Sequence, residues 1–150
     1  MSNVRALFHI VFTTKYRERS ITPDKEEELY KYITGIIKNN KSYMLQINGM
    51  SDHIHLLIDL HPTISLSELV ADVKRDSSKW IRDNSLFPKF RGWNEGYFAA
   101  TCSVESSKNV INYIRNQKMH HAGRDFMDEI KDFYIRNGIE WDENAIRRWS

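Results

Sequence analysis

Two histidines alternate with aliphatic side chains in the stretch DHIHLLIDL at 52–60. Side chains point alternately to the two faces of a β-strand, so a strand here places His53 and His55 on one face and Ile54 and Leu56 on the other. Each residue of a strand rises ~3.3 Å, which puts the two histidine Cα atoms roughly 6.5–7 Å apart. Two imidazoles at that separation can hold one metal ion, although half-buried histidines without any ligand are the more frequent meaning of this spacing.

A second group of polar side chains lies in NYIRNQKMHH at 112–121. Tyr113, Gln117 and His121 follow one another at intervals of four residues, which aligns them on one stripe of a helix. If this stripe covers the histidines, the amide oxygen of Gln117 completes a His-His-Gln site for Mg²⁺ or Mn²⁺, with Tyr113 one turn away. A tyrosine at a helix interface is more often a core residue than a nucleophile, so it is the position beside Gln117 that favours Tyr113 among the seven tyrosines.

Strand and helix patterns surround these residues. Thr22 and Pro23 predict a helix start, as the N-cap and the first helical position. Ser65 followed by Glu68 is the capping-box signature of a second helix, and Gly123 favours the end of a third. We predict a strand at 4–14, a helix at 21–40, two strands within 42–60, a helix at 65–84, a strand at 96–104, a helix at 105–123, a short acidic helix near 125–137 and an irregular tail.

The order β-α-β-β-α-β followed by a helix predicts an α+β fold. The expected architecture is a ferredoxin-like antiparallel sheet with an additional C-terminal helix that carries Tyr113. The chain has 150 residues, of which 41% are hydrophobic and 28% charged, and this composition predicts one globular domain over 1–150. The first two helices should cover one face of the sheet, which leaves the histidine face partly open for a site.

The sequence lacks signals for a membrane or a nucleotide cofactor. No apolar run approaches the ~18 residues of a membrane span. The apolar start of the chain is interrupted by His9 and is not followed by a small-residue cleavage site, so we expect a cytoplasmic protein. No glycine-rich phosphate-binding loop is present either.

Positive charge is concentrated in the middle of the chain. Residues 74–124 carry ten Lys or Arg against four Asp or Glu, whereas the formal net charge of the whole chain is only +2. Such a segment favours a polyanionic partner about as strongly as it favours a solvated basic face.

Several stretches taken together resemble one known family. DHIHLL at 52–57 and NYIRNQKMHH at 112–121 resemble the single-tyrosine HUH transposases of bacterial insertion sequences, which include the REP-associated tyrosine transposases. HUH denotes two histidines separated by a hydrophobic residue. FHIVFTTKYR at 8–17, WNEGYFAATCSV at 93–104 and GIEWDE at 138–143 are also similar to this family. The stretches follow the family's order and span nearly the whole chain.

The resemblance implies a fold, a site and a reaction. The fold is the ferredoxin-like one, and the reaction is cleavage and rejoining of single-stranded DNA at hairpin ends. His53, His55 and Gln117 would bind the divalent metal, and Tyr113 would form a 5′-phosphotyrosine. The family forms homodimers, often with the tyrosine helix docked on the partner's metal site. The basic side chains expected to contact DNA are Lys15, Arg17, Lys74, Arg75, Lys79, Arg82, Arg91, Lys108, Arg115 and Lys118.

Other functions are compatible with the same residues. A domesticated REP-associated transposase or nickase would act on repeated palindromes without mobility. A non-catalytic ferredoxin-like nucleic-acid-binding protein would tolerate Tyr113→Phe. A replication initiator or relaxase of the HUH class is usually larger and often has two tyrosines. His120 and His121 are candidates for a general base, but histidines near a helix C-terminus also favour the helix dipole. Asp52 has no assigned role.

Overall fold

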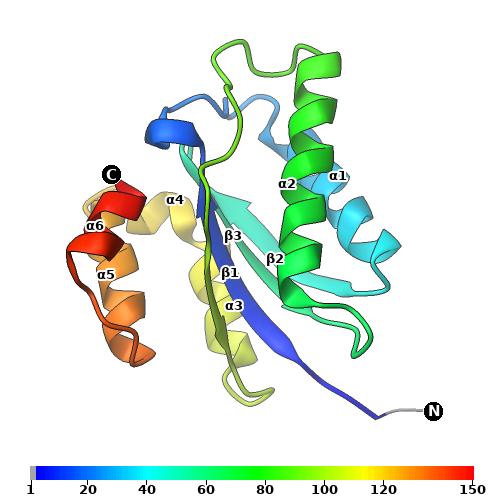
Figure 1. Cartoon of the computed structure of the whole chain (residues 1–150), viewed down its shortest axis with the longest axis vertical. Helices are drawn as coiled ribbons and strands as arrows, with labels where there is room; N and C mark the ends of the chain where they lie inside the picture. Colours follow the sequence, from blue (N-terminus) through cyan, green and yellow to red (C-terminus); the bar gives the residue numbers. More distant parts are fainter. Residues whose placement is uncertain (1–2) are drawn as a thin grey trace.

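An antiparallel sheet forms the centre of the molecule (Figure 1). The structure is a computed structural model and describes residues 3–150. The strands are β1 (Leu7–Thr13), β2 (Tyr43–Gly49), β3 (His53–Asp59) and β4 (Phe98–Thr101), and their spatial order is β2-β3-β1-β4. β1 pairs with β3 and with β4, and β2 pairs with β3, in every case antiparallel. The predicted ferredoxin-like arrangement is therefore confirmed.

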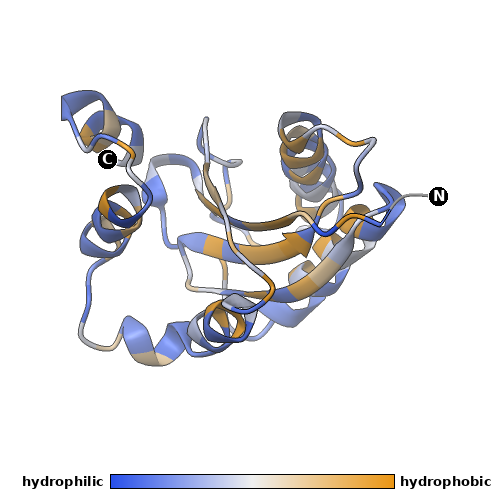
Figure 2. Cartoon of the chain, turned by 90° about the horizontal axis from the view of Figure 1, so that it is seen from below, coloured by the Kyte–Doolittle hydropathy of each residue, from blue (hydrophilic) through white to orange (hydrophobic). Residues whose placement is uncertain are grey.

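Helices flank this sheet on both sides. The helices are α1 (Glu26–Asn39), α2 (Leu66–Asp83), α3 (Ser107–Arg115), α4 (Gln117–His120), α5 (Phe126–Arg136) and α6 (Glu143–Trp149), and the short 3-10 helix η1 (Lys15–Arg17) follows β1. α1 and α2 pack on one side of the sheet, and α3 and α5 on the other. Figure 2 shows the α5–α6 pair and α2 on opposite sides of the strands.

The predicted capping residues behave in two different ways. The Ser65 side chain accepts a hydrogen bond from the backbone N–H of Glu68, as the capping-box pattern predicts for α2. The prediction that Thr22 and Pro23 begin α1 is wrong. Residues 22–25 instead form a turn, in which the N–H of Lys25 donates to the carbonyl of Thr22, and the helix begins at Glu26.

The second half of the chain also differs in detail from the prediction. The predicted strand at 96–104 is ordered as a strand only over β4, which pairs only with β1 among the described strands. The predicted third helix is interrupted at Asn116, whose φ of −96° and ψ of 21° end α3 before α4 begins. The tail is not irregular: Asp142 accepts a hydrogen bond from the N–H of Ala145 and caps α6.

An aliphatic core fills the space between the sheet and the α1–α2 layer. β1 and β3 alternate, so every second side chain of each strand enters this core. Its fully buried members from the strands are Ile10, Phe12, Ile54, Leu56 and Ile58, and those from the helices include Leu29, Ile33, Ile37, Leu69 and Val73. Burial of one such side chain is worth about 1.5–3 kcal/mol, so this layer is a main source of stability.

The opposite face of the sheet is covered, so the prediction of a partly open face is wrong. Ile114 of α3 packs on Leu7 and Leu57, and Ile130 of α5 belongs to a cluster with Val11. The extra helices return over this face because their apolar stripes need a surface to cover. The histidines of β3 therefore lie inside the protein.

Residues 3–150 contain no helix that combines the length and the apolar character needed to cross a membrane.

Candidate metal centre and nucleophile

Three histidines from two adjacent strands form the floor of the candidate site. His53 and His55 of β3 are both fully buried, and His9 of β1 is 7% exposed. In the β1–β3 register His55 lies opposite Val11, two residues from His9 on the same face. The His9 Nε2 and the His55 Nδ1 are 2.9 Å apart, which is a hydrogen bond. The prediction that the His53 and His55 side chains share one face is confirmed.

Glu129 of α5 stands over these imidazoles. Its side chain is 1% exposed, and its Oε1 atom lies 3.4 Å from the Nε2 of His53 and 3.2 Å from the Nε2 of His55. His121, which follows α4, places its own Nε2 3.1 Å from the same oxygen. One carboxylate oxygen thus faces three imidazole nitrogens.

The stripe of Tyr113 and Gln117 reaches this site within the same chain. Tyr113 donates a hydrogen bond through its hydroxyl to the Oε2 atom of Glu129, and Gln117 donates to that oxygen through Nε2 at 3.1 Å. The Oε1 atom of Gln117 lies 3.2 Å from the Nε2 of His53. The break at Asn116 does not disperse the stripe, because Tyr113, Gln117 and His121 all contact Glu129.

Burial sets the protonation of the two linked imidazoles. It lowers the pKa of His55 to about 4, although the Glu129 carboxylate opposes this change. Burial together with the neighbouring His55 lowers the pKa of His9 to about 3. Both rings are therefore neutral near pH 7, and a neutral imidazole is the form that binds a metal.

Carboxylates act in the opposite direction on His53. Burial alone would lower its pKa, but hydrogen bonds with Asp52 and Glu129 raise it. The Nδ1 of His53 donates to the Oδ1 of Asp52 at 2.7 Å, which leaves its Nε2 directed towards Glu129. A carboxylate on the outer nitrogen of a metal-binding histidine fixes the ring and its tautomer, so this contact gives Asp52 a physical role.

Glu129 and Tyr113 have shifted pKa values for related reasons. Burial would raise the pKa of Glu129, but its hydrogen bonds with His121, His53 and His55 lower it further than burial raises it. Burial raises the pKa of the Tyr113 phenol, and the negative charge of Glu129 raises it further. The phenol is therefore held in its protonated form next to an ionised carboxylate.

The donor set fits a divalent cation. Ligand atoms of His53, His55 and Glu129 all lie within 4.8 Å of one another. The predicted third ligand Gln117 turns its amide oxygen to the same side, which adds a neutral donor. Two imidazole nitrogens with carboxylate and amide oxygens suit a cation between hard and borderline, such as Mn²⁺ or Mg²⁺. His9 can donate to or accept from the Nδ1 of His55, so it supports either tautomer of that ring.

Sequence reasoning missed two members of this group, Glu129 and His9. Glu129 lies on the apolar stripe of α5, with Phe126, Ile130 and Phe133 as buried neighbours at helical spacing. A carboxylate on an otherwise apolar helical stripe was the signal in the sequence that could have identified Glu129. His9 shares the face of Leu7 and Val11, and the antiparallel pairing that places it near His55 was not readable from the strand alone.

The basic residues predicted to bind DNA are divided between the two layers. Four of them, Lys74, Arg75, Lys79 and Arg82, belong to α2, on the side away from the histidines. Lys74 donates to the carbonyls of Asn94 and Gly96, and burial lowers its pKa to about 8. Among the other three, the exposed Arg75 and Lys79 pair with acids of their own helix, and Arg82 donates to Ser78.

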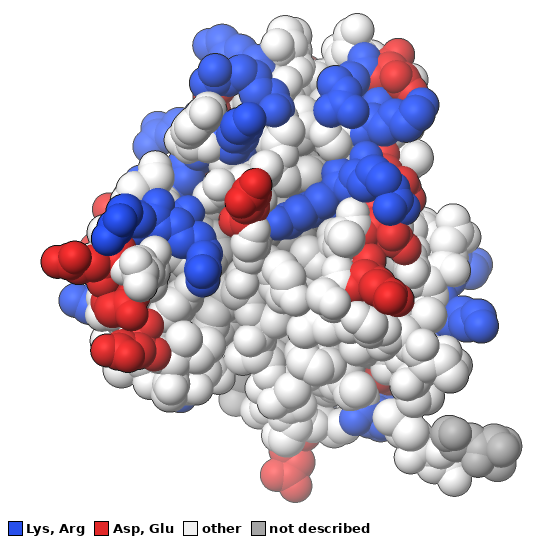
Figure 3. Space-filling view, in the orientation of Figure 1, with Lys and Arg blue, Asp and Glu red and all other residues white. Residues whose placement is uncertain are grey.

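The remaining predicted DNA contacts lie outside α2. Arg91 pairs with Glu18, and Lys118 contacts Glu26 and β2. Lys15, Lys108 and Arg115 are exposed, and Arg17 is half-buried. In Figure 3 the Lys and Arg side chains gather on the upper part of the face shown, with acidic side chains between them, and the lower part is mostly uncharged.

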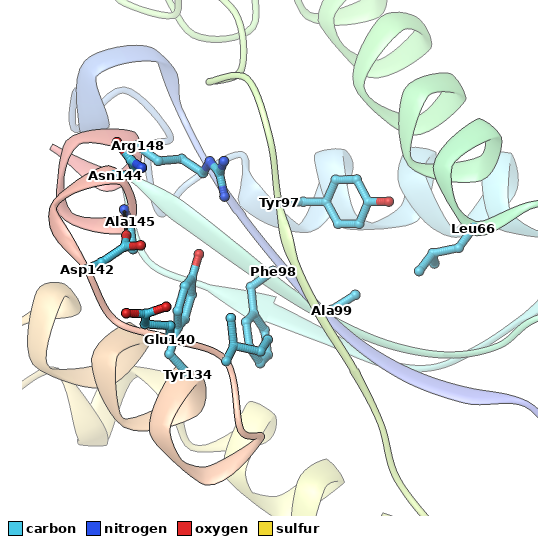
Figure 4. Close-up of a pocket in the computed structure, with 11 residues that line it drawn as sticks. Leu66, Tyr97, Phe98, Ala99, Tyr134, Glu140, Asp142, Asn144, Ala145 and Arg148 are labelled. Atoms are coloured by element: carbon cyan, nitrogen blue, oxygen red, sulfur yellow. Dashed lines mark hydrogen bonds between the residues drawn. The ribbon is translucent and has the colours of Figure 1, made fainter.

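One groove of the surface lies away from the histidines. It has a volume of about 530 Å³ and runs between β4, α5 and α6 (Figure 4). Tyr134 and Phe98 form part of its wall, and Arg148 extends from α6 over it. Glu140 and Asp142 line it as well, so its charge is mixed. The candidate site is therefore located by its converging donor atoms and not by this groove.

Comparisons with known proteins show which family the sequence resembles. Residues 2–117 match the family model described as "Transposase IS200 like". The chain is 27% identical over 115 residues to the transposase for insertion sequence element IS200 of Salmonella typhimurium, covering 73% of this chain and 75% of that protein. It is 24% identical over 115 residues to the ISDra2 transposase TnpA of Deinococcus radiodurans, covering 73% of this chain and 82% of that protein.

Solved structures show the same fold. A crystal structure from Deinococcus radiodurans R1 that carries a transposase designation superimposes with a TM-score of 0.60 at 25% identity, covering 78% of this chain and 95% of that one. The REP-associated tyrosine transposase gives a TM-score of 0.60 at 13% identity over 81% of this chain and 74% of its own. Glu129 lies beyond the segment that the family model matches, whereas His53, His55, Tyr113 and Gln117 lie within it. On these findings, the chain belongs to the family of IS200-like transposases.

Proposed function

We propose that this protein cleaves and rejoins single-stranded DNA at the hairpin ends of a genetic element, through a covalent 5′-phosphotyrosine at Tyr113. One observation carries the proposal: a phenol, an amide and two imidazoles from β3, α3 and α4 converge on the Glu129 carboxylate in one buried site. A metal centre beside a tyrosine hydroxyl is the arrangement that phosphoryl transfer to a protein nucleophile requires.

The proposed cleavage step balances as a transesterification. The Tyr113 oxygen forms a bond with phosphorus, and the bond between phosphorus and the 3′ oxygen of the preceding nucleotide breaks. The phenol proton passes to solvent water, the Glu129 carboxylate orients the phenol through its existing hydrogen bond, and the leaving 3′ oxygen takes up a proton from solvent. The phosphodiester energy is kept in the tyrosine ester, so a 3′ hydroxyl can later reverse the step without a nucleotide cofactor.

His53, His55 and Glu129 would hold the cation, with Gln117 as a further ligand. The cation, which we propose to be Mg²⁺ or Mn²⁺, would supply charge neutralisation at the scissile phosphate. Around it, the chain's own residues fix the ligands: Asp52 orients His53, and His9 orients His55. The burial of both histidines keeps bulk water from these positions.

The DNA partner is inferred from the family and from charge. The structure of the REP-associated tyrosine transposase contains a REP hairpin, and we propose a hairpin substrate for this chain too. Among the predicted phosphate contacts, Lys108 and Arg115 belong to α3 and Lys118 to α4, on the layer of the site. Those on α2 remain predictions for DNA that extends further. Tyr113 reaches the histidines of its own chain, so the proposed homodimer is not needed to assemble the site shown.

Covalent capture on single-stranded DNA tests the proposal. Purified protein is incubated with Mg²⁺ or Mn²⁺ and labelled hairpins taken from the DNA that flanks its gene. We expect an adduct that survives denaturing electrophoresis and is absent for the Tyr113→Phe variant. The matched control is Tyr43→Phe, which removes an exposed hydroxyl on β2 and should leave the adduct unchanged.

Two results would contradict this function. Adduct formation by Tyr113→Phe would show that another group is the nucleophile. Tight DNA binding without any adduct, in wild type and variant alike, would favour the non-catalytic nucleic-acid-binding alternative. A mobile element is distinguished from a domesticated relative by whether paired hairpins on both sides of the gene are cut.

A further inference from the structure

A small basic pocket opens directly beside the candidate metal centre. It has a volume of about 230 Å³, and three arginines, Arg17, Arg19 and Arg124, contribute to its wall. Asp52 and His121 also line it, and these residues contact His53 and Glu129 respectively. A ligand in this pocket would therefore be a neighbour of whatever occupies the metal centre.

The backbone holds Arg17 in this pocket at a conformational cost. Tyr16 and Arg17 have φ values of 59° and 51°, the left-handed region that residues other than glycine rarely adopt. The Arg17 guanidinium lies 5.6 Å from the centroid of the Phe126 ring, and that ring is 4.5 Å from the ring of His53. Strained residues of this kind persist where the surrounding structure fixes them, and they cluster at ligand sites.

The hydrogen-bonding capacity of Arg17 is incompletely used. Its Nε atom is buried and has no hydrogen-bond partner among residues 3–150. A buried N–H without a partner is costly, and a guanidinium is well suited to hold a phosphate by two parallel hydrogen bonds. An acceptor for this N–H is therefore not provided by residues 3–150.

The other charges of the pocket leave room for an anion. Asp52 is engaged by His53, and Asp125 caps α5 by accepting a hydrogen bond from Met127 N–H. Arg124 pairs with Asp132 at 2.6 Å. Within the described residues, neither Arg17 nor Arg19 has a carboxylate at ion-pair distance, although the Asp52 carboxylate in the same wall interacts with the Arg17 charge over a longer distance.

We propose that this pocket binds a backbone phosphate of the single-stranded DNA, next to the phosphate at the metal centre, with Arg17 as the principal contact. This inference rests on the proposed function and adds to it a subsite that positions the strand. Arg17 would hold the strand in register for the attack by Tyr113. Arg19, which is exposed at the rim, would assist.

Salt-dependent binding of a simple strand tests the pocket. The Tyr113→Phe background prevents covalent trapping, and fluorescence anisotropy with labelled oligothymidylate and Mn²⁺ measures affinity at several salt concentrations. We expect Arg17→Gln to weaken binding by roughly 10-fold and to reduce the log–log salt slope by about 0.7, the contribution of one phosphate contact on a single strand. Arg17→Lys should keep the slope and recover only part of the affinity, because the bidentate geometry is lost.

The matched control is Arg147→Gln, which removes one exposed positive charge from α6. Equal effects of Arg17→Gln and Arg147→Gln would overturn the proposal, provided that circular dichroism and melting temperature show both variants folded. If inorganic phosphate raised the melting temperature only when Arg17 is present, while oligothymidylate affinity stayed unchanged, the pocket would bind a free anion and the proposal would also fail. Selective Arg17 dependence for oligouridylate would exclude DNA as its ligand.

The proposed transesterification and the proposed phosphate pocket can be contradicted independently of each other. If Tyr113 forms the adduct in the capture experiment but Arg17→Gln binds normally, only the phosphate pocket is wrong. If oligothymidylate binding depends on Arg17 but no hairpin gives an adduct, the pocket stands and the transesterification does not.

Discussion

The two faces of the central sheet differ in character although they alternate along the same strands. In β3, Ile54 and Leu56 enter an aliphatic core, while His53 and His55, which alternate with them, enter a cluster of titratable groups. Both pairs are fully buried. Burial by itself therefore does not distinguish a residue that stabilises the fold from one that does chemistry.

The two faces differ in how the loss of hydration of their buried side chains is compensated. Transfer of aliphatic side chains out of water is favourable by itself. Imidazoles, an amide and a carboxylate lose solvation on the other face, and hydrogen bonds to one another have to offset that loss. The α1–α2 face should thus contribute to stability alone, whereas the α3–α5 face, which also has apolar clusters, should in addition control metal binding and reactivity.

The largest expected effect comes from removing a ligand. His55→Ala should reduce the affinity for Mn²⁺ at least about 100-fold, since loss of a supporting residue alone commonly costs 10–100-fold. Titration calorimetry measures this affinity directly. The control is His61→Ala, which truncates a half-buried histidine outside the strands and should leave metal affinity unchanged. Similar losses of affinity in both variants would show that the metal does not bind at the histidine face.

The adjacent residue of the same strand should give the complementary result. Leu56→Ala leaves a cavity in the aliphatic core and should lower the free energy of unfolding by about 2–5 kcal/mol. Metal affinity of the folded variant should stay within a few-fold of wild type, because its side chain points away from the site. Urea unfolding followed by circular dichroism gives the first value and calorimetry the second. A large loss of metal affinity with little loss of stability would contradict the proposed separation of the stabilising face from the metal-binding face.

Lowering the pH should destabilise the metal-free protein, because its buried imidazoles resist protonation. The effect should be smaller than those of the two substitutions above. The pKa of His55 is about 4 in the folded protein and near 6.5 when unfolded. The unfolded chain therefore binds more protons as the pH falls from about 6.5 to 4, and the folded state of the metal-free protein should lose about 3 kcal/mol from this residue. His9, with a pKa of about 3, acts in the same direction, and the raised pKa of His53 opposes it at higher pH.

Melting temperatures between pH 7.5 and 4 in the presence of a chelator measure this loss. His55→Leu should flatten the acid branch of the profile, because an aliphatic side chain does not titrate. The His61→Leu variant, changed outside the strands, should retain the wild-type profile. An unchanged acid branch in His55→Leu would mean that other groups dominate acid unfolding.

Local patterns sufficed for much of the fold. Alternation in β1 and β3 placed each side chain on a face, and Ser65 with Glu68 marked the start of α2. These features depend on residues a few positions apart, whose geometry is set by the strand or helix itself. The failures at Thr22 and at Asn116 occurred at helix ends, where packing of the whole chain competes with weak local preferences.

The sequence by itself determined which side chains share a face: His53 with His55, and Tyr113 with Gln117. Only the tertiary structure decided what lies over them. Glu129 and Arg17 come from α5 and from the turn after β1, far from the histidines along the chain, and nothing in their immediate sequence requires them to meet there. Convergence of distant segments is decided by the burial of apolar stripes on the sheet, which is a property of the whole chain.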